Sequence, residues 1–90
     1  MNNLNWTVKF TKKAENEFKS LDKYIQSKIK KAIFEKLLTN PSLYLKPLLG
    51  DKSGLYKFRV GGYRLLCAKE DGELVIMVVK VKHRRDVYSN

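Results

Sequence analysis

The sequence predicts an α+β fold: a short N-terminal strand, a helix hairpin and a three-stranded antiparallel meander, with the helices packed on one face of the sheet. Two observations carry this prediction. Apolar residues recur at helical spacing through the first half of the chain, and three runs with strand-like alternation follow in the second half. A chain of 90 residues is long enough for one domain, which we expect to span residues 1–90.

The N-terminal half begins with an alternating segment, WTVKF at residues 6–10, as expected of a half-buried strand. Thr11 can then cap a short helix, and Asp22 can cap a longer second one. That second helix is expected to stop before Asn40-Pro41, because a residue that precedes proline avoids helical backbone angles. The prolines and glycines that follow predict an irregular link from Asn40 to Gly54.

The second half contains the strand-like runs LYKFRV, YRLLCAK and ELVIMVVKVK, separated by Gly61-Gly62 and by Glu70-Asp71-Gly72. If the glycine pair forms a two-residue turn, Arg59 lies directly opposite Arg64. Alternation then places one apolar set toward the helices: Tyr56, Phe58, Val60, Tyr63, Leu65 and Cys67.

The last strand has two possible orientations, because the loop before it can hold two residues or three. Lys80 and Lys82 decide between them, since neither lysine belongs in the core. A three-residue loop is therefore expected, with a core set of Val75, Met77, Val79 and Val81. Lys80 then shares the outer face of the sheet with Lys57, Arg59 and Arg64.

Composition favours a polyanionic partner. The chain has 19 Lys and Arg against 9 Asp and Glu, a formal net charge of +10. One cysteine and one histidine provide neither an internal disulfide nor a structural zinc site, and we expect no metal and no cofactor. The longest apolar run, residues 74–79, is far too short to cross a bilayer, so a cytoplasmic protein is expected.

The outer face is expected to bind an anion. Arginines directly opposite each other repel, whereas an opposite-charge pair there contributes roughly 0.2–1 kcal/mol. Folding gains nothing from Arg59 beside Arg64, but a phosphate between them explains the arrangement. The alternative is that both side chains extend into water or pair with a distant carboxylate.

The C-terminal segment KVKHRRDVYSN leaves the last strand beside this outer face and can bring His83, Arg84 and Tyr88 to it. Histidine exchanges protons near neutral pH, arginine keeps its charge, and tyrosine can stack on a base. A lone histidine is, however, more often structural than catalytic, and the tyrosine could simply fill a gap.

Two quoted segments carry a family resemblance. LLGDKSGLYKFRVGGYRLL followed by VKVKHRRDVY resembles the RelE/ParE superfamily of bacterial toxins, and specifically its RelE branch, and the resemblance covers nearly the whole chain. The combination of G-x-x-S-G-L-Y-[KR]-x-R-x-G-x-Y-R with H-R-R-[DE]-V-Y is specific. Lys82 is a departure, because many relatives have glycine there.

The resemblance implies a metal-independent endoribonuclease that cuts mRNA, usually in the ribosomal A site. It also implies a cognate RelB-like antitoxin that covers the basic surface of the toxin. Operator DNA would be bound only through the toxin–antitoxin complex.

The same resemblance implies roles for individual residues. Arg59 and Arg64 would grip the scissile phosphate, Arg84 would support the leaving side, and Tyr88 would orient a base. Arg59 stands where some members have a lysine proposed as the base, and a guanidinium does not readily give up its proton. The base is therefore left between two candidates, and the remaining cations would bind RNA: Lys57 or His83 as base, and Lys80, Lys82 and Arg85 as RNA contacts.

Two other functions compete with this hypothesis. ParE-like members of the superfamily poison DNA gyrase on the same fold, although they generally lack the full set of cations described above. A non-catalytic module would merely dock on nucleic acid or on an acidic partner, with weak and salt-sensitive affinity.

Overall fold

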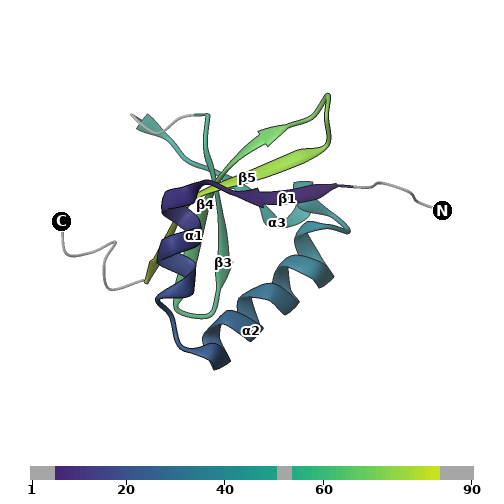
Figure 1. Ribbon diagram of the computed structural model, residues 1–90. Helices are drawn as coiled ribbons and strands as arrows, with labels where there is room; N and C mark the ends of the chain where they lie inside the picture. The colour runs from purple at the N-terminus through teal and green to yellow at the C-terminus, as the bar shows by residue number, and fades with distance from the viewer. Residues whose placement is uncertain (1–5, 51–53, 84–90) are drawn as a thin grey trace.

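The computed structural model describes residues 6–50 and 54–83 and confirms the α+β fold. Helices α1 and α2 lie on one side of a five-stranded sheet with strand order β1-β5-β4-β3-β2 (Figure 1). The elements in chain order are β1 (Thr7–Phe10), α1 (Lys12–Lys19), α2 (Lys23–Ala32), the π-helix η1 (Ile33–Leu37), α3 (Pro41–Tyr44), β2 (Lys46–Pro47), β3 (Tyr56–Val60), β4 (Tyr63–Glu70) and β5 (Val75–His83).

Both predicted helix caps are present. The Thr11 hydroxyl accepts a hydrogen bond from the Ala14 amide at 3.1 Å, and the Asp22 carboxylate accepts one from the Ile25 amide at 2.9 Å. Each cap satisfies a backbone donor that the first helical turn leaves free. None of the helices in the described ranges is long and apolar enough to cross a membrane.

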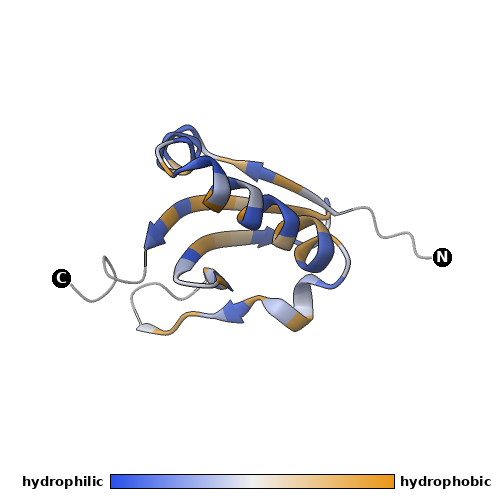
Figure 2. Ribbon diagram, turned by 90° about the horizontal axis from the view of Figure 1, so that it is seen from below, coloured by the Kyte–Doolittle hydropathy of each residue, from blue (hydrophilic) through white to orange (hydrophobic). Residues whose placement is uncertain are grey.

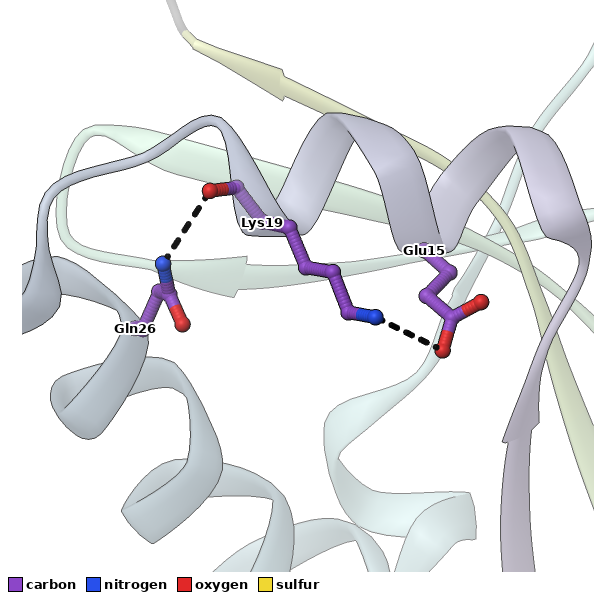
Figure 3. Close-up of polar contacts among 3 residues, drawn as sticks. All are labelled: Glu15, Lys19 and Gln26. Atoms are coloured by element: carbon purple, nitrogen blue, oxygen red, sulfur yellow. Dashed lines mark hydrogen bonds and ion pairs between the residues drawn. The ribbon is translucent and has the colours of Figure 1, made fainter.

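Polar contacts hold the turn between α1 and α2 (Figure 3). The Gln26 side-chain amide donates to the carbonyl of Lys19 at 3.3 Å. It also donates to the carbonyl of Leu21 at 2.7 Å. On α1 itself, Lys19 forms an ion pair with Glu15 at 3.5 Å. Because these exposed charges contribute little stability, the hairpin depends mainly on its apolar side.

That apolar side forms one core with the sheet. The buried hydrophobic residues come from α1, α2, η1, the segment after α3 and three strands: Ala14, Phe18, Ile29, Ile33, Leu37, Leu45, Phe58, Leu65, Cys67, Ile76, Val78 and Val81. Cys67 is fully buried, and this burial raises the pKa of its thiol to about 12. Its predicted place in the core is confirmed, and the thiol stays protonated at neutral pH.

Two edge strands extend the predicted meander. β1 pairs in parallel with β5, from Thr7 opposite Val75 to Phe10 opposite Val78. β2 pairs antiparallel with β3, with Lys46 opposite Lys57. The sequence predicted β1 but not its partner, and it did not predict β2, which lies in the segment expected to be irregular.

The predicted turn at Gly61-Gly62 is confirmed. Val60 lies opposite Tyr63, and Arg59 lies opposite Arg64. Gly61 has a backbone φ of +58°, a left-handed conformation that glycine adopts without steric cost. The turn therefore fixes the register of β3 against β4, and Phe58 and Leu65 face the helices as predicted.

The predicted loop between β4 and β5 is wrong. Glu70 pairs with Val75, so the loop holds the four residues 71–74 and not three. One additional residue reverses the faces of the next strand. Ile76 and Val78 are consequently the fully buried residues in this half of β5, whereas the predicted core positions Val75 and Met77 are only partly buried and face outward.

A β-bulge restores the predicted orientation beyond this point. Cys67 pairs with Val78 but Leu66 pairs with Lys80, so Val79 is an extra residue in β5. Val79 therefore does not belong to the core set, while Val81 does. In Figure 2 the last part of β5, next to the C-terminal trace, is coloured hydrophilic.

The bulge also marks where β1 leaves β5. β1 pairs only with residues 75–78, and the Thr11 amide then donates to the Val78 carbonyl at 3.0 Å. Past the bulge, the Val81 amide donates to the carboxylate of Glu17 on α1 at 2.8 Å. A side chain of α1 thus replaces the missing strand partner at this edge of the sheet.

Deleting Val79 should leave the fold largely intact, because it removes the extra residue and not a paired one. Alternation from Ile76 and Val78 then continues directly, with Lys80 and Lys82 outward and Val81 toward the helices. Urea denaturation should show a loss of about 1–2 kcal/mol, against about 3 kcal/mol or more for deletion of Met77, a paired residue whose loss shifts the buried Ile76 to the other face. Equal losses for the two deletions would contradict the assignment of the bulge.

Candidate nucleic-acid interface

Two rows of cations cross the face of the sheet that α1 and α2 leave uncovered. Residues directly opposite each other on paired strands point to the same face. One row runs Arg59, Arg64, Lys82 across β3, β4 and β5, and the other runs Lys46, Lys57, Leu66, Lys80 from β2 to β5. We call the six cations of these rows the cationic face: Lys46, Lys57, Arg59, Arg64, Lys80 and Lys82.

The described residues offer the cationic face no ion-pair partner. In residues 6–50 and 54–83, ion pairs join Lys19 to Glu15 and Lys69 to Asp71, and neither involves this face. In the same ranges no group of three or more His, Cys, Asp or Glu residues is placed to hold a metal ion. The chemistry of the face is therefore that of an anion receptor built from ammonium and guanidinium groups.

Lys80 has the most crowded surroundings on this face. The close contact with the Lys13 ammonium of α1 is the largest cause that lowers the pKa of Lys80, and the charges of Lys13 and Lys82 lower it further. The Glu17 carboxylate, which accepts from the Val81 amide, acts in the opposite direction. Lys13 thus extends the positive charge of the face around the β5 edge of the sheet.

His83 does not share a face with the arginines. His83 is paired with Tyr63, which is paired in turn with Val60. Both of these residues lie on the helix side of the sheet. Its ring meets the Tyr63 ring edge-on, with 4.7 Å between centroids. The reason is alternation, because Lys82 points outward and the next residue in the strand points the other way.

The β5 edge nevertheless brings His83 near the cations. A hollow of about 480 Å³ there is lined by side chains of both faces and of α1, among them Glu17, Lys80, Lys82 and His83. The structure thus groups the predicted residues of β3 and β4 with Lys80 and Lys82, and it sets His83 at the margin of the group. Arg84, Arg85 and Tyr88 lie outside the described residues.

One member of the cationic face, Lys46, was not predicted from the sequence. Lys46 lies opposite Lys57 in β2, within a segment read as an irregular link. A cavity of about 620 Å³ beside it is lined by Lys36, Leu43, Tyr44, Lys46, Lys57, Phe58 and Arg59. The only signal in the sequence was a lysine following a leucine and preceding a proline, which does not identify a two-residue strand.

Comparison with known proteins gives the family. Residues 8–88 match the ParE toxins of type II toxin–antitoxin systems. The chain belongs to the RelE/ParE superfamily of toxins. The resemblance read from the two sequence segments is therefore confirmed.

Relatives within the superfamily carry RelE-type names. The chain is 31% identical over 83 residues to the toxin RelG of Mycobacterium tuberculosis, which covers 92% of this chain and 95% of RelG. It is 36% identical over 89 residues to a putative RelE-like toxin protein of Escherichia coli, covering 96% and 93% of the two chains.

Solved structures of RelE toxins have the same fold. A chain of the M. tuberculosis toxin–antitoxin complex RelBE2 superposes with a TM-score of 0.83 at 30% identity, covering 89% of this chain and 99% of that one. The isolated E. coli RelE toxin gives a TM-score of 0.73 at 28% identity, covering 93% and 92%. This RelE/ParE chain is thus RelE-like in sequence and in fold.

Removing the Lys13 ammonium should raise the pKa of Lys80 toward its ordinary value of 10.5, because a neighbouring cation disfavours the charged form. NMR titration of the lysine side-chain signals should show this rise in Lys13→Gln. Lys12→Gln, a change at an exposed position of the same helix, is the control and should leave Lys80 unchanged. Identical Lys80 titrations in the two variants would disprove the contact.

Replacing Arg59 with glutamate should stabilise the fold. The change converts a repulsive cross-strand pair with Arg64 into an attractive one, for a gain of roughly 0.2–1 kcal/mol. Urea denaturation at low salt measures the gain, which should shrink as salt is added. Lys9→Glu, at an exposed position of β1 opposite the uncharged Met77, is the comparison, and an equal gain there would show that net charge and not the pair is responsible.

Proposed function

We propose that this RelE-like toxin is an endoribonuclease that cuts mRNA on the ribosome and so inhibits translation in the cytoplasm. The observation that carries the proposal is the pairing of Arg59 with Arg64 on an uncovered sheet face without a carboxylate partner among the described residues. The similarity to RelE-type relatives also supports the proposed endoribonuclease function. A polyanionic chain is the substrate that such a face suits best.

The proposed reaction is an internal transfer at phosphorus. The ribose 2′-oxygen attacks the adjacent phosphate, its proton goes to a base, and the bond to the departing 5′-oxygen breaks as that oxygen takes up a proton. Negative charge develops on the phosphate oxygens during this step. Arg59 and Arg64, opposite each other on paired strands, would stabilise that charge, and in this mechanism no metal ion is needed.

The register favours Lys57 over His83 as the proton acceptor. Lys57 is two residues from Arg59 in the same strand and therefore points to the same face, whereas His83 lies in a row with Tyr63 on the helix side. His83 could still serve at the β5 edge, where it borders the hollow that it shares with Lys80 and Lys82. We therefore assign Lys57 as base and keep His83 as the alternative.

The remaining roles follow from the family resemblance. Arg84 would support the leaving oxygen, and Tyr88 would orient or stack on a base. Lys80 and Lys82 would bind the RNA backbone together with Arg85.

We further propose that a RelB-like antitoxin neutralises the toxin. RelE chains of 30% and 26% identity to this one come from solved toxin–antitoxin complexes of M. tuberculosis and E. coli, respectively. A partner that covers the cationic face would exclude RNA from it. Operator DNA would be bound by the complex and not by the toxin alone.

Poisoning of DNA gyrase is the second candidate, because the matching family description names ParE toxins. The two functions make opposite predictions about the first process to stop after the toxin is expressed. A ribonuclease halts translation before replication, and a gyrase poison halts replication first. Pulse labelling of protein and of DNA in the same culture distinguishes them.

Arg64→Ala should abolish toxicity without unfolding the protein. Loss of a group that stabilises developing charge typically lowers the rate by about 10²–10³-fold. The measurement is the map of cleavage sites on a translated message after brief expression, read beside growth of the culture. Lys31→Ala, which removes one charge from an exposed position on α2, is the control and should remain toxic.

A folded Arg64→Ala protein that still cuts the message at the wild-type sites would remove Arg64 from the mechanism. Wild-type toxin that arrests growth without cutting any message, with replication stopping first, would replace the ribonuclease proposal with the gyrase one. Circular dichroism and urea denaturation of each variant establish that the comparison is between folded proteins.

A further inference from the structure

A cavity at the β2 edge of the sheet adjoins the cationic face. Its volume of about 620 Å³ falls within the roughly 300–1,000 Å³ range of small-molecule sites. β2 pairs with Tyr56 and Lys57 only, so the cavity lies where β3 continues without a neighbouring strand on this side. The walls come from η1, α3, β2 and β3.

Among the described residues, four cations and no carboxylate line this cavity. Lys46 and Lys57 lie opposite each other on paired strands, Arg59 follows in β3, and Lys36 approaches from η1. Like charges around one concave surface concentrate positive potential and attract an anion. Two of these cations also belong to the proposed catalytic set, so the cavity is continuous with the site at which RNA would be cut.

Tyr44 provides an aromatic surface beside the charges. Its ring packs against the core and is only partly exposed, so the fold holds its orientation. The Lys36 ammonium lies 5.5 Å from the centre of this ring. Cations that follow a phosphate backbone, combined with an aromatic ring for the base, are the features by which proteins bind single-stranded nucleic acid.

We propose that this cavity binds one nucleotide of single-stranded RNA next to the scissile phosphate. Its base contacts the Tyr44 ring, and its phosphate binds Lys46. The inference rests on the proposed ribonuclease function and adds Tyr44, Lys46 and Lys36 to the RNA-binding residues. RNA fits better than an acidic peptide, because the cavity joins an aromatic ring to the residues that would hold the phosphate to be cut.

The test is direct binding of an RNA that cannot be cut. A fluorescein-labelled hexanucleotide with 2′-O-methyl groups throughout has no attacking hydroxyl, so its fluorescence anisotropy reports binding alone. Lys46→Gln should weaken binding by about fivefold or more at low salt. It should also reduce the slope of log affinity against log salt by about 0.7, the value for one phosphate contact on a single strand.

Lys31→Gln is the matched control, since it removes the same charge from α2, away from the cavity. It should weaken binding by less than about twofold and leave the salt slope nearly unchanged. Equal effects of Lys46→Gln and Lys31→Gln would overturn the proposal and leave only net-charge attraction. Because Lys46 is exposed, Lys46→Gln should not unfold the protein. This comparison therefore does not depend on whether the variants of the partly buried Tyr44 fold.

The contact with the base is tested separately. Tyr44→Leu should weaken binding by roughly tenfold, the effect of losing one stacked base, without changing the salt slope. Tyr44→Phe keeps the ring and should bind like the wild type. With an oligonucleotide that lacks its bases, Tyr44→Leu and wild type should bind equally, and an equal loss on both oligonucleotides would refute the stacking role.

Two further results separate this inference from its alternatives. Wild-type protein that binds the blocked RNA as expected but never cuts an unblocked message would defeat the ribonuclease proposal and keep the nucleotide site. Lys46→Gln protein that loses affinity for the antitoxin but none for the RNA would show that the cavity receives a peptide, and would defeat the nucleotide site.

Discussion

The extra residue in β5 is the constraint on which the rest of the structure depends. Ile76 and Val78 are fully buried before it, and Val81 returns to the core after it. With uninterrupted alternation, either the lysines at the end of this strand or its most buried residues would lie on the wrong face. The bulge at Val79 lets one strand supply both the core and the outer row of cations.

The energies explain why the fold tolerates its own charge repulsion. Arg59 opposite Arg64 forgoes a cross-strand contribution of roughly 0.2–1 kcal/mol. Complete burial of a single side chain such as Phe58 contributes about 1.5–3 kcal/mol. The stabilisation from the core on one face therefore exceeds the repulsion on the other. Residues of the outer face can consequently serve binding with only a small loss of folding stability.

Features determined by neighbours in sequence could be predicted, and features determined by distant pairing could not. The caps at Thr11 and Asp22 and the turn at Gly61-Gly62 are local, and all three are present. The bulge was missed because every residue from 74 to 79 is apolar, so either alternation gives a plausible core. Distant pairing also determines the partner of β1 and the strand β2, which were not predicted. The position of His83 away from the arginines, by contrast, follows from local alternation after Lys82 and could have been predicted.

The extent of the cationic face argues for a polymeric ligand. Its longer row crosses four strands, from Lys46 on β2 to Lys80 on β5, and Lys13 continues it past the edge. At a spacing of about 4.8 Å between strands, the row extends about 14 Å. A single phosphate would leave most of these cations without a partner, whereas a chain with repeated phosphates can neutralise them in turn. The sheet therefore suits a nucleic-acid strand better than a small phosphorylated metabolite.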